Sequence, residues 1–329
     1  MIETAAFAVV AFMLTAYVLL DGYDLGVASV VPLIARSDRE RAAAMRSIGP
    51  FWNGNEVWLI AAGGVLFALF PAAYAAAFSG FYLPFTIVLW LLMFRGIALE
   101  LRDHLQSDLW HTFWDAAFWI SSCLLVATFG LALGNLVRGV PLGADGYFAG
   151  TFGFLLNPYA GLVALFALVT LAQHGAAFAA MRIDGAPAER ASRLMRRLWW
   201  AVLSLYLGAS AATFWVRGVP AHGASLVLPL LSLAAMIALR IAIARDRATA
   251  AFAASCAFVV TLLAAAAVTL YPYLLPAFPA GRGGLSIYQT ATSPAGLTVG
   301  LTVAIAGSIA ALIYGSAVWR RMATKIRVE

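Results

Sequence analysis

The chain has little charge. Only 11% of its 329 residues are Asp, Glu, Lys or Arg, whereas 63% are hydrophobic and the mean hydropathy is +0.90. A soluble domain carries about 25% charged residues, so this composition excludes an ordinary soluble protein. The apolar runs are about 20 residues long, as a bilayer-spanning helix requires, and they lack the alternation of a membrane β-barrel. We therefore predict an all-α polytopic membrane protein.

Side chains that bind metals or haem are also scarce, with two cysteines and four histidines. Cys123 and Cys256 lie inside apolar runs and are predicted to be small core residues. His104 and His111 lie in a polar connection and are predicted to be solvated, and we expect His174 to be a hydrogen-bonded core residue. No His-x-x-x-His or Cys-x-x-Cys-His occurs. We expect no metal site and no cofactor, haem included, bound by this chain.

Motifs of soluble enzymes are missing as well. The sequence has no Walker A motif, no Gly-x-Ser-x-Gly and no His-Glu-x-x-His, so we predict no catalytic residue in this chain. The first residues carry no basic segment ahead of the first apolar run, so no cleavable signal is predicted.

Nine membrane spans can be drawn from the apolar runs. They cover residues 8–34, 54–76, 78–100, 113–135, 156–181, 198–217, 224–243, 250–272 and 295–318. The second and third spans are separated only by Pro71 and a short Ala-rich stretch, which predicts a tight antiparallel hairpin. Two connections, 136–155 and 273–294, are longer than the rest.

Basic residues are distributed unevenly between alternate connections. With the N-terminus outside, 18 of the 21 Lys and Arg fall on the inside, and only Arg138, Arg217 and Arg282 fall outside. Cytoplasmic connections carry the excess of Lys and Arg, so we predict an outside N-terminus and a cytoplasmic C-terminus. The net charge of +6 then reflects topology and contact with membrane lipids. No basic, aromatic face for nucleic acid is present.

Ionisable residues inside membrane spans are candidates for function. Asp21 and Asp24 lie on one helix face, because they are three residues apart. Glu56 opens the second span from the inside and Arg95 closes the third span there, so Asp24, Glu56 and Arg95 should converge near the cytoplasmic surface. The remaining candidates are Glu100, Asp115 and His174. The cluster predicts a proton or ion path from the cytoplasm, and a structural salt bridge between helices is the alternative.

A polar box, residues 52–56, begins the second span. It reads Trp-Asn-Gly-Asn-Glu, and Trp58 follows it. Asn ahead of Glu at a helix start is also typical of N-capping, which would explain Asn53 without a function. Capping explains the whole box less well, because Gly54 and Asn55 would have no part in it.

These boxes together resemble subunit II of cytochrome bd-type terminal quinol oxidases. The resemblance is dense over residues 15–160 and continues more thinly to the C-terminus, and the short chain is more similar to the cyanide-insensitive branch. The matching motifs are Asp21–Gly26 (DGYDLG), Trp52–Leu59 (WNGNEVWL), Phe67–Tyr82, Phe94–Gly96 (FRG), Gly134–Pro141 and Leu156–Pro158.

The resemblance implies nine helices in one transmembrane domain over residues 1–329. It implies a first four-helix bundle in 1–135, a second in 156–272 and a peripheral helix at 295–318. The partner would be subunit I, which carries the b and d haems and the quinol-oxidising loop, in a bacterial inner membrane. A small single-helix subunit and a structural quinone or lipid are further partners that such a complex allows.

For this chain the resemblance implies support of assembly, haem retention in subunit I and cytoplasmic proton supply for oxygen reduction. The family commonly has Asp where this chain has Asn53, and Asn cannot titrate. We hypothesise that Glu56, with Asp24, replaces that carboxylate. The proton-path candidates are Asp21, Asp24, Asn53, Glu56, Arg95 and Glu100, and the structural residues of the box are Trp52, Gly54, Asn55 and Trp58.

Two other functions compete with this interpretation. A proton-coupled secondary transporter would show matching interrupted helices in its two halves, whereas the charged candidates here cluster in the first third of the chain. A purely structural scaffold subunit would use the same charges only to hold helices together.

Overall fold

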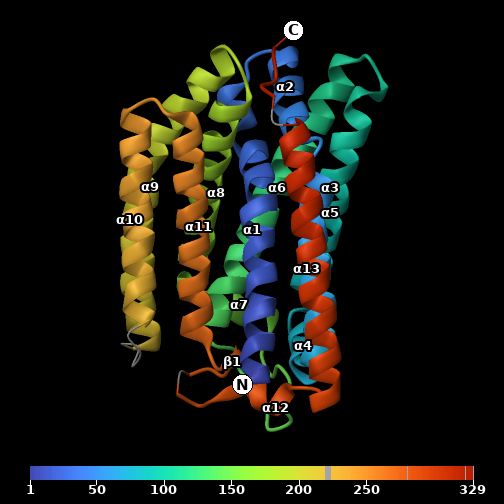
Figure 1. The fold of residues 1–329 in the computed structure, drawn as a ribbon, viewed down its shortest axis with the longest axis vertical. Helices are drawn as coiled ribbons and strands as arrows, with labels where there is room; N and C mark the ends of the chain where they lie inside the picture. The colour runs from blue at the N-terminus through green and yellow to red at the C-terminus, as the bar shows by residue number, and fades with distance from the viewer. Residues whose placement is uncertain (219–223, 280, 323, 329) are drawn as a thin grey trace.

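The computed structural model describes residues 1–218, 224–279, 281–322 and 324–328, and most of them are helical (Figure 1). The elements in chain order are α1 (Ile2–Ile34), α2 (Asp38–Ile48), α3 (Trp52–Leu69), α4 (Pro71–Gly80), α5 (Tyr82–Leu101), η1 (Arg102–His104), α6 (Asp108–Arg138), α7 (Phe152–Leu155), α8 (Pro158–Arg182), α9 (Ala186–Arg217), α10 (Ala224–Ala244), α11 (Ala248–Leu270), β1 (Tyr273–Pro276), β2 (Gly284–Ser286), α12 (Ile287–Thr290) and α13 (Pro294–Met322).

Eight helices in these ranges are long and apolar enough to cross a membrane. They are α1, α5 continued by η1, α6, α8, α9, α10, α11 and α13. The all-α polytopic class is therefore confirmed. Helix α3 is not among the eight, because the polar box occupies its first turn. The ninth crossing and the orientation in the membrane stay predictions.

The predicted second span, 54–76, is wrong in its end. Helix α3 stops at Leu69, Phe70 leaves the helical conformation with φ −136° and ψ 62°, and Pro71 begins the separate helix α4. Proline disfavours helical backbone at the residue before it and lacks the N–H that would continue the helix. The second and third predicted spans are thus joined by a short helix instead of a bare turn.

Helix α1 lies at the centre of the molecule (Figure 1). It packs against α3 and α6 on one side and α8 on the other, and it also touches α11 and α13. Residues 21–28 are all buried, so this part of α1 is enclosed around its whole circumference. The DGYDLG motif therefore sits where helices from both halves of the chain meet.

The other helices surround α1 in two groups. Helices α3, α5 and α6 contact α1 or one another, α8 to α11 pack in sequence, and α13 lies against α1 and α3. Both α1 and α6 contact α8, so packing is continuous across the two groups. The division of the domain into two bundles stays a prediction.

The two long connections pack together at one end. β1 and β2 pair antiparallel, with Tyr273 opposite Ser286. The Val140 N–H donates to the Pro276 carbonyl at 2.9 Å, and the Phe278 N–H donates back to Val140 at 2.8 Å. The Arg138 guanidinium lies over the rings of Phe154 and Phe278 at 4.6 and 4.4 Å.

The Arg-rich connections meet at the opposite end. Arg190 in α9 pairs with Glu40 in α2 at 2.6 Å. The C-terminal tail returns to the end of α8, where Ile326 bridges Ile183 and Arg182 donates to the Met322 and Thr324 carbonyls. The segments predicted to be cytoplasmic therefore share one face of the molecule, and the two chain termini lie at opposite ends (Figure 1).

Two glycines allow α1 and α8 to touch at backbone distance. A Cβ on Gly26 would collide with the Leu171 carbonyl and the Gly175 backbone, and a Cβ on Gly175 would collide with Gly26 and Val27. Beside this contact Tyr23 stacks on Phe178, with ring centroids 4.3 Å apart. The close approach fixes how deep the acidic pair of α1 lies against α8.

We predict that Gly175→Ala destabilises the protein by about 2 kcal/mol or more, because the added methyl group has only backbone to displace. Gly161→Ala is the matched control on the same helix, since a Cβ there meets no atom within 4 Å. The control should be neutral or slightly stabilising, as alanine favours helix over glycine by about 1 kcal/mol. Thermal unfolding of the purified complex measures both, and equal midpoints for the two variants would contradict the predicted contact.

Candidate functional site

A buried ion pair joins α1 to α5. Arg95, in the last part of α5, donates from Nη2 to Asp21 Oδ1 at 2.6 Å and from Nη1 to Asp21 Oδ2 at 3.0 Å. Both side chains are 0% exposed. This two-pronged contact is the strongest form of carboxylate–guanidinium pairing.

Glu56 brings α3 into the same group. Its Oε1 accepts a second hydrogen bond from Arg95 Nη1 at 2.9 Å. Its side chain is 20% exposed, whereas Arg95 and Asp21 are fully enclosed. Glu56 is thus the member of the ion-pair group that reaches the surface of this chain.

Asp24 is held mainly by an amide. Asn55 Nδ2 donates to Asp24 Oδ2 at 2.7 Å and lies 2.8 Å from the Tyr23 hydroxyl. Arg95 Nη2 is 4.0 Å from Asp24 Oδ2, which is too long for a hydrogen bond. Asn55 therefore has a defined task in the box, namely to hold Asp24 beside the arginine.

Polar atoms around Arg95 are left free for further hydrogen bonds. Tyr17 Oη, Asp24 Oδ1 and Arg95 Nε are buried and have no partner within the described ranges. Buried polar groups of this kind are usually satisfied by water. The arrangement of donors and acceptors around the ion pair is compatible with hydration.

The remaining residues of the box face in two directions. Asn53 and Gly54 are exposed, whereas Trp52 and Trp58 are buried. The Trp52 ring lies against Gly96, where a Cβ would come within 3.4 Å of it, so the glycine of the FRG motif makes room for the tryptophan. Asn53 lies outside the buried ion-pair group.

The capping interpretation of Asn53 is wrong. The N-cap of α3 is Phe51, and no side chain accepts a hydrogen bond from the first turn. Glu100 also lies apart from the group, because it is exposed and forms no salt bridge within the described ranges. Of the proton-path candidates, the structure brings together Asp21, Asp24, Glu56 and Arg95.

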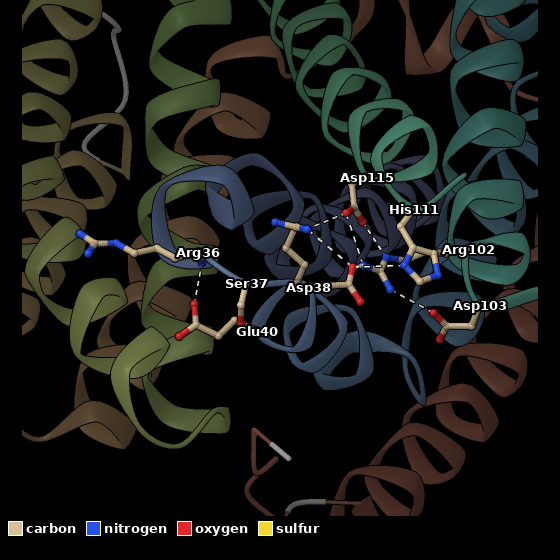
Figure 2. Close-up of polar contacts among 9 residues, drawn as sticks. Arg36, Ser37, Asp38, Glu40, Arg102, Asp103, His111 and Asp115 are labelled. Atoms are coloured by element: carbon tan, nitrogen blue, oxygen red, sulfur yellow. Dashed lines mark hydrogen bonds and ion pairs between the residues drawn. The ribbon is translucent and has the colours of Figure 1, made fainter. Parts of the chain in front are cut away.

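A second ion network, which the sequence does not predict, lies at the Arg-rich end (Figure 2). Arg102 is 2% exposed and donates to carboxylates on three elements. Its partners are Asp38 of α2 at 2.5 Å, Asp103 of η1 at 3.0 Å and Asp115 of α6 at 2.6 Å. Arg41 Nε adds a contact of 2.8 Å to Asp115. This clamp ties α2 to η1 and α6.

His111 belongs to this network, so the expectation that it is solvated is wrong. It is 9% exposed, and its Nδ1 lies 3.3 Å from Asp38 Oδ1. The sequence carries no signal for this pairing, because charged residues and histidines in a polar connection are expected to be solvated.

His174 is a hydrogen-bonded core residue, as expected. Its Nδ1 contacts the Ser255 hydroxyl and its Nε2 lies 3.1 Å from the Leu19 carbonyl, so it ties α8 to α11 and α1. Within the described part of the chain no three His, Cys, Asp or Glu side chains gather as a metal site.

Comparison with known proteins gives the family. The family described as cytochrome bd terminal oxidase subunit II matches residues 2–322. The chain belongs to this family. It is therefore a multi-pass membrane subunit of a cytochrome bd quinol oxidase complex, with subunit I as its partner.

Individual relatives agree with this assignment. The chain is 29% identical over 356 residues to subunit 2 of the cytochrome bd-I ubiquinol oxidase of Escherichia coli, covering 97% of this chain and 94% of that one. It is 31% identical over 224 residues to the Bacillus subtilis cytochrome bd ubiquinol oxidase subunit 2, covering 68% and 66%. The structure of bd oxidase from Geobacillus thermodenitrificans has the same fold, with a TM-score of 0.80, 20% identity and coverage of 97% and 98%.

Replacing Arg95 by Met should destabilise this bd subunit by about 3–5 kcal/mol, because the buried Asp21 carboxylate loses its partner. The double variant Arg95→Met, Asp21→Asn should recover part of that loss, since it removes the unpaired charge as well. Thermal unfolding of the purified complex gives both values. Equal stability of Arg95→Met and the parent would show that the ion pair does not hold α1 and α5 together.

The second network predicts a dependence on pH. Burial alone would raise the pKa of Asp38, but Arg102, with His111 and Arg41, holds it below the ordinary value of 3.8. A carboxylate with a lowered pKa stabilises the fold above its unfolded pKa and loses this effect as the pH falls through the folded value.

Amides of α2 should therefore stay protected from hydrogen exchange down to about pH 4 and lose protection below it. In Asp38→Asn, protection should be lower near neutral pH and should vary less across this range. Exchange rates corrected for intrinsic chemistry test this, and identical profiles for the two proteins would contradict it.

Proposed function

We propose that this chain is the subunit of a bacterial bd-type quinol oxidase that binds no haem and delivers cytoplasmic protons toward subunit I. The observation that carries the proposal is the Arg95 group, in which three carboxylates surround one buried guanidinium and only Glu56 is partly exposed. Reduction of oxygen to water consumes protons, and a carboxylate that connects a buried polar group to the surface can relay them.

The three carboxylates differ in their freedom to carry a proton. Asp21 uses both oxygens on Arg95, so protonation would break the two-pronged contact. Asp24 keeps Oδ1 free, and the hydrogen bond of Glu56 to Arg95 uses Oε1. Protons are therefore best held on Glu56 and Asp24, while Arg95 stays charged and Asp21 neutralises it.

The position of Asn53 supports Glu56 as the replacement for the carboxylate that the family commonly carries there. Asn53 and Glu56 are three residues apart on α3, so they share a helix face, and both reach the surface of this chain. Glu56 also connects to Arg95. In this proposal the box keeps its function, with the titrating group displaced by about one turn.

In this proposal the haems are bound by subunit I and not by this chain. The family resemblance assigns haems b and d to subunit I, and we propose that subunit II supports assembly of the complex and haem retention there. A small single-helix subunit and a structural quinone or lipid would complete the complex in the bacterial inner membrane.

A scaffold role without proton transfer is the second candidate. The complete burial of Arg95 and Asp21 favours it, because a pair that water does not reach serves to lock helices together. A self-contained transporter is less consistent with the fold, since the buried carboxylates and Arg95 all lie on α1, α3 and α5.

Replacing Glu56 by Gln in the complete oxidase decides between the two. Removing the titrating group should slow oxygen consumption and proton uptake by about tenfold or more, while the amide keeps its size and haem content stays intact. Oxygen electrode assays, proton uptake measurements and a reduced-minus-oxidised spectrum follow the three quantities.

Glu3→Gln serves as a control for the exchange of a carboxyl for an amide. The Glu3 side chain is 28% exposed, similar to the 20% of Glu56, and it lies at the start of α1, away from the Arg95 group. Unchanged turnover in Glu56→Gln would exclude Glu56 as the relay. Loss of haem without a specific loss of proton uptake would favour the scaffold role.

A further inference from the structure

Arginines gather where α9 passes the turn between α10 and α11. This turn lies at the end of the molecule that also holds α2 and the C-terminus (Figure 1). We call the group the arginine step, and its members are Arg193, Arg196 and Arg197 of α9, Arg240 of α10, and Arg245 and Arg247 of the turn.

Three contacts hold the step together. Arg196 Nη2 pairs with Asp246 Oδ1 at 3.4 Å, which places the turn beside α9. The Trp199 indole donates to the Met236 carbonyl at 2.9 Å, and the Arg240 guanidinium lies 5.9 Å from the Trp199 ring. Basic side chains from two different parts of the chain therefore occupy one small region.

Two parts of the chain, α9 and the α10–α11 turn, border the arginine step. Arg196 comes ten residues after the start of α9 at Ala186, so α9 continues past the α10–α11 turn by about 15 Å at 1.5 Å per residue. The turn itself is tight, because Asp246 adopts the left-handed conformation with φ 50°. Arginines of α9 and arginines of the turn therefore border the same region from two sides.

Positive charge in the step exceeds its negative charge. Glu189 pairs with Arg193 at 3.7 Å, and Asp246 pairs with Arg196. The other four arginines form no salt bridge within the described ranges, and three of them are exposed. These three are Arg197, Arg245 and Arg247.

Apolar side chains continue from the step toward the middle of the membrane. Trp200 is 61% exposed beside Arg197, and Ile241 and Ile237 on α10 are 46% and 51% exposed. Trp residues concentrate at the membrane–water interface, so Trp200 marks the level of the lipid headgroups. At that level the phosphate groups of the lipids would lie beside the arginines, and the acyl chains beside the exposed apolar residues.

We propose that the arginine step binds the headgroup of an anionic phospholipid. Guanidinium groups donate paired hydrogen bonds to phosphate oxygens, and basic pockets at membrane helix ends recognise anionic lipids. The acyl chains of the bound lipid lie along the exposed face of α10 and Trp200. This continuity of charge and apolar surface fits a phospholipid better than a soluble phosphate, which has no apolar part.

The test compares two triple variants in the complete oxidase. Arg197→Gln, Arg245→Gln, Arg247→Gln removes the unpaired charges of the step, and Arg320→Gln, Arg321→Gln, Arg327→Gln removes three charges at the same end of the molecule. Native mass spectrometry counts the phosphatidylglycerol retained, and titration with phosphatidylglycerol nanodiscs gives the affinity. We expect affinity to fall about 100-fold in the first triple variant and about threefold or less in the second.

Phosphatidylcholine and inorganic phosphate are the comparison ligands, and neither should raise the unfolding temperature of the parent as phosphatidylglycerol does. Equal losses in the two triple variants would show general attraction to a negative surface and overturn the site. Stabilisation by inorganic phosphate alone would overturn the assignment to a lipid. Absence of retained phosphatidylglycerol in the parent would do so as well.

Discussion

A guanidinium group enclosed within a membrane protein must be neutralised, and this requirement determines how α1, α3 and α5 pack. Burying an unpaired charge costs several kcal/mol even after relaxation, and Arg95 is 0% exposed. Asp21 and Glu56 come from two different helices to meet it. The polar boxes of this chain are thus parts of a single contact, and Gly96 leaves room beside it for Trp52.

The same contact accounts for both candidate functions, and the proton hypothesis depends on an asymmetry within it. The two-pronged Asp21–Arg95 pair is internal and complete, as a structural lock should be. Asp24 and Glu56 are bound less fully, and Glu56 opens to the surface. An ion pair with a purely structural role would not require the partial exposure of Glu56. This is the physical reason to place the mobile proton on Glu56 and to leave Asp21 as the counter-charge.

The convergence of Asp24, Glu56 and Arg95 could be predicted because charges in apolar runs are few and need partners, and because the distribution of basic residues indicates their depth. The clamp around Arg102 could not be predicted, because charged residues in polar connections are expected to be solvated. Nothing in the sequence indicates which of them pair. The predicted second span ends too late, because the apolar composition continues past Pro71 whereas helix α3 ends at Leu69. The contact of Gly26 with Gly175 could not be predicted either, because it depends on how two helices far apart in the sequence cross.

The position of the Arg95 group near the start of the chain has a consequence for biosynthesis. All its members lie within the first 101 residues, and the two acidic helices, α1 and α3, precede α5. During synthesis the carboxylates enter the bilayer ahead of the arginine, so each must remain near the aqueous surface or protonated until α5 arrives. Insertion of α5 then neutralises the group in one step. The contact between α1, α3 and α5 can in this way form before the second half of the protein leaves the ribosome.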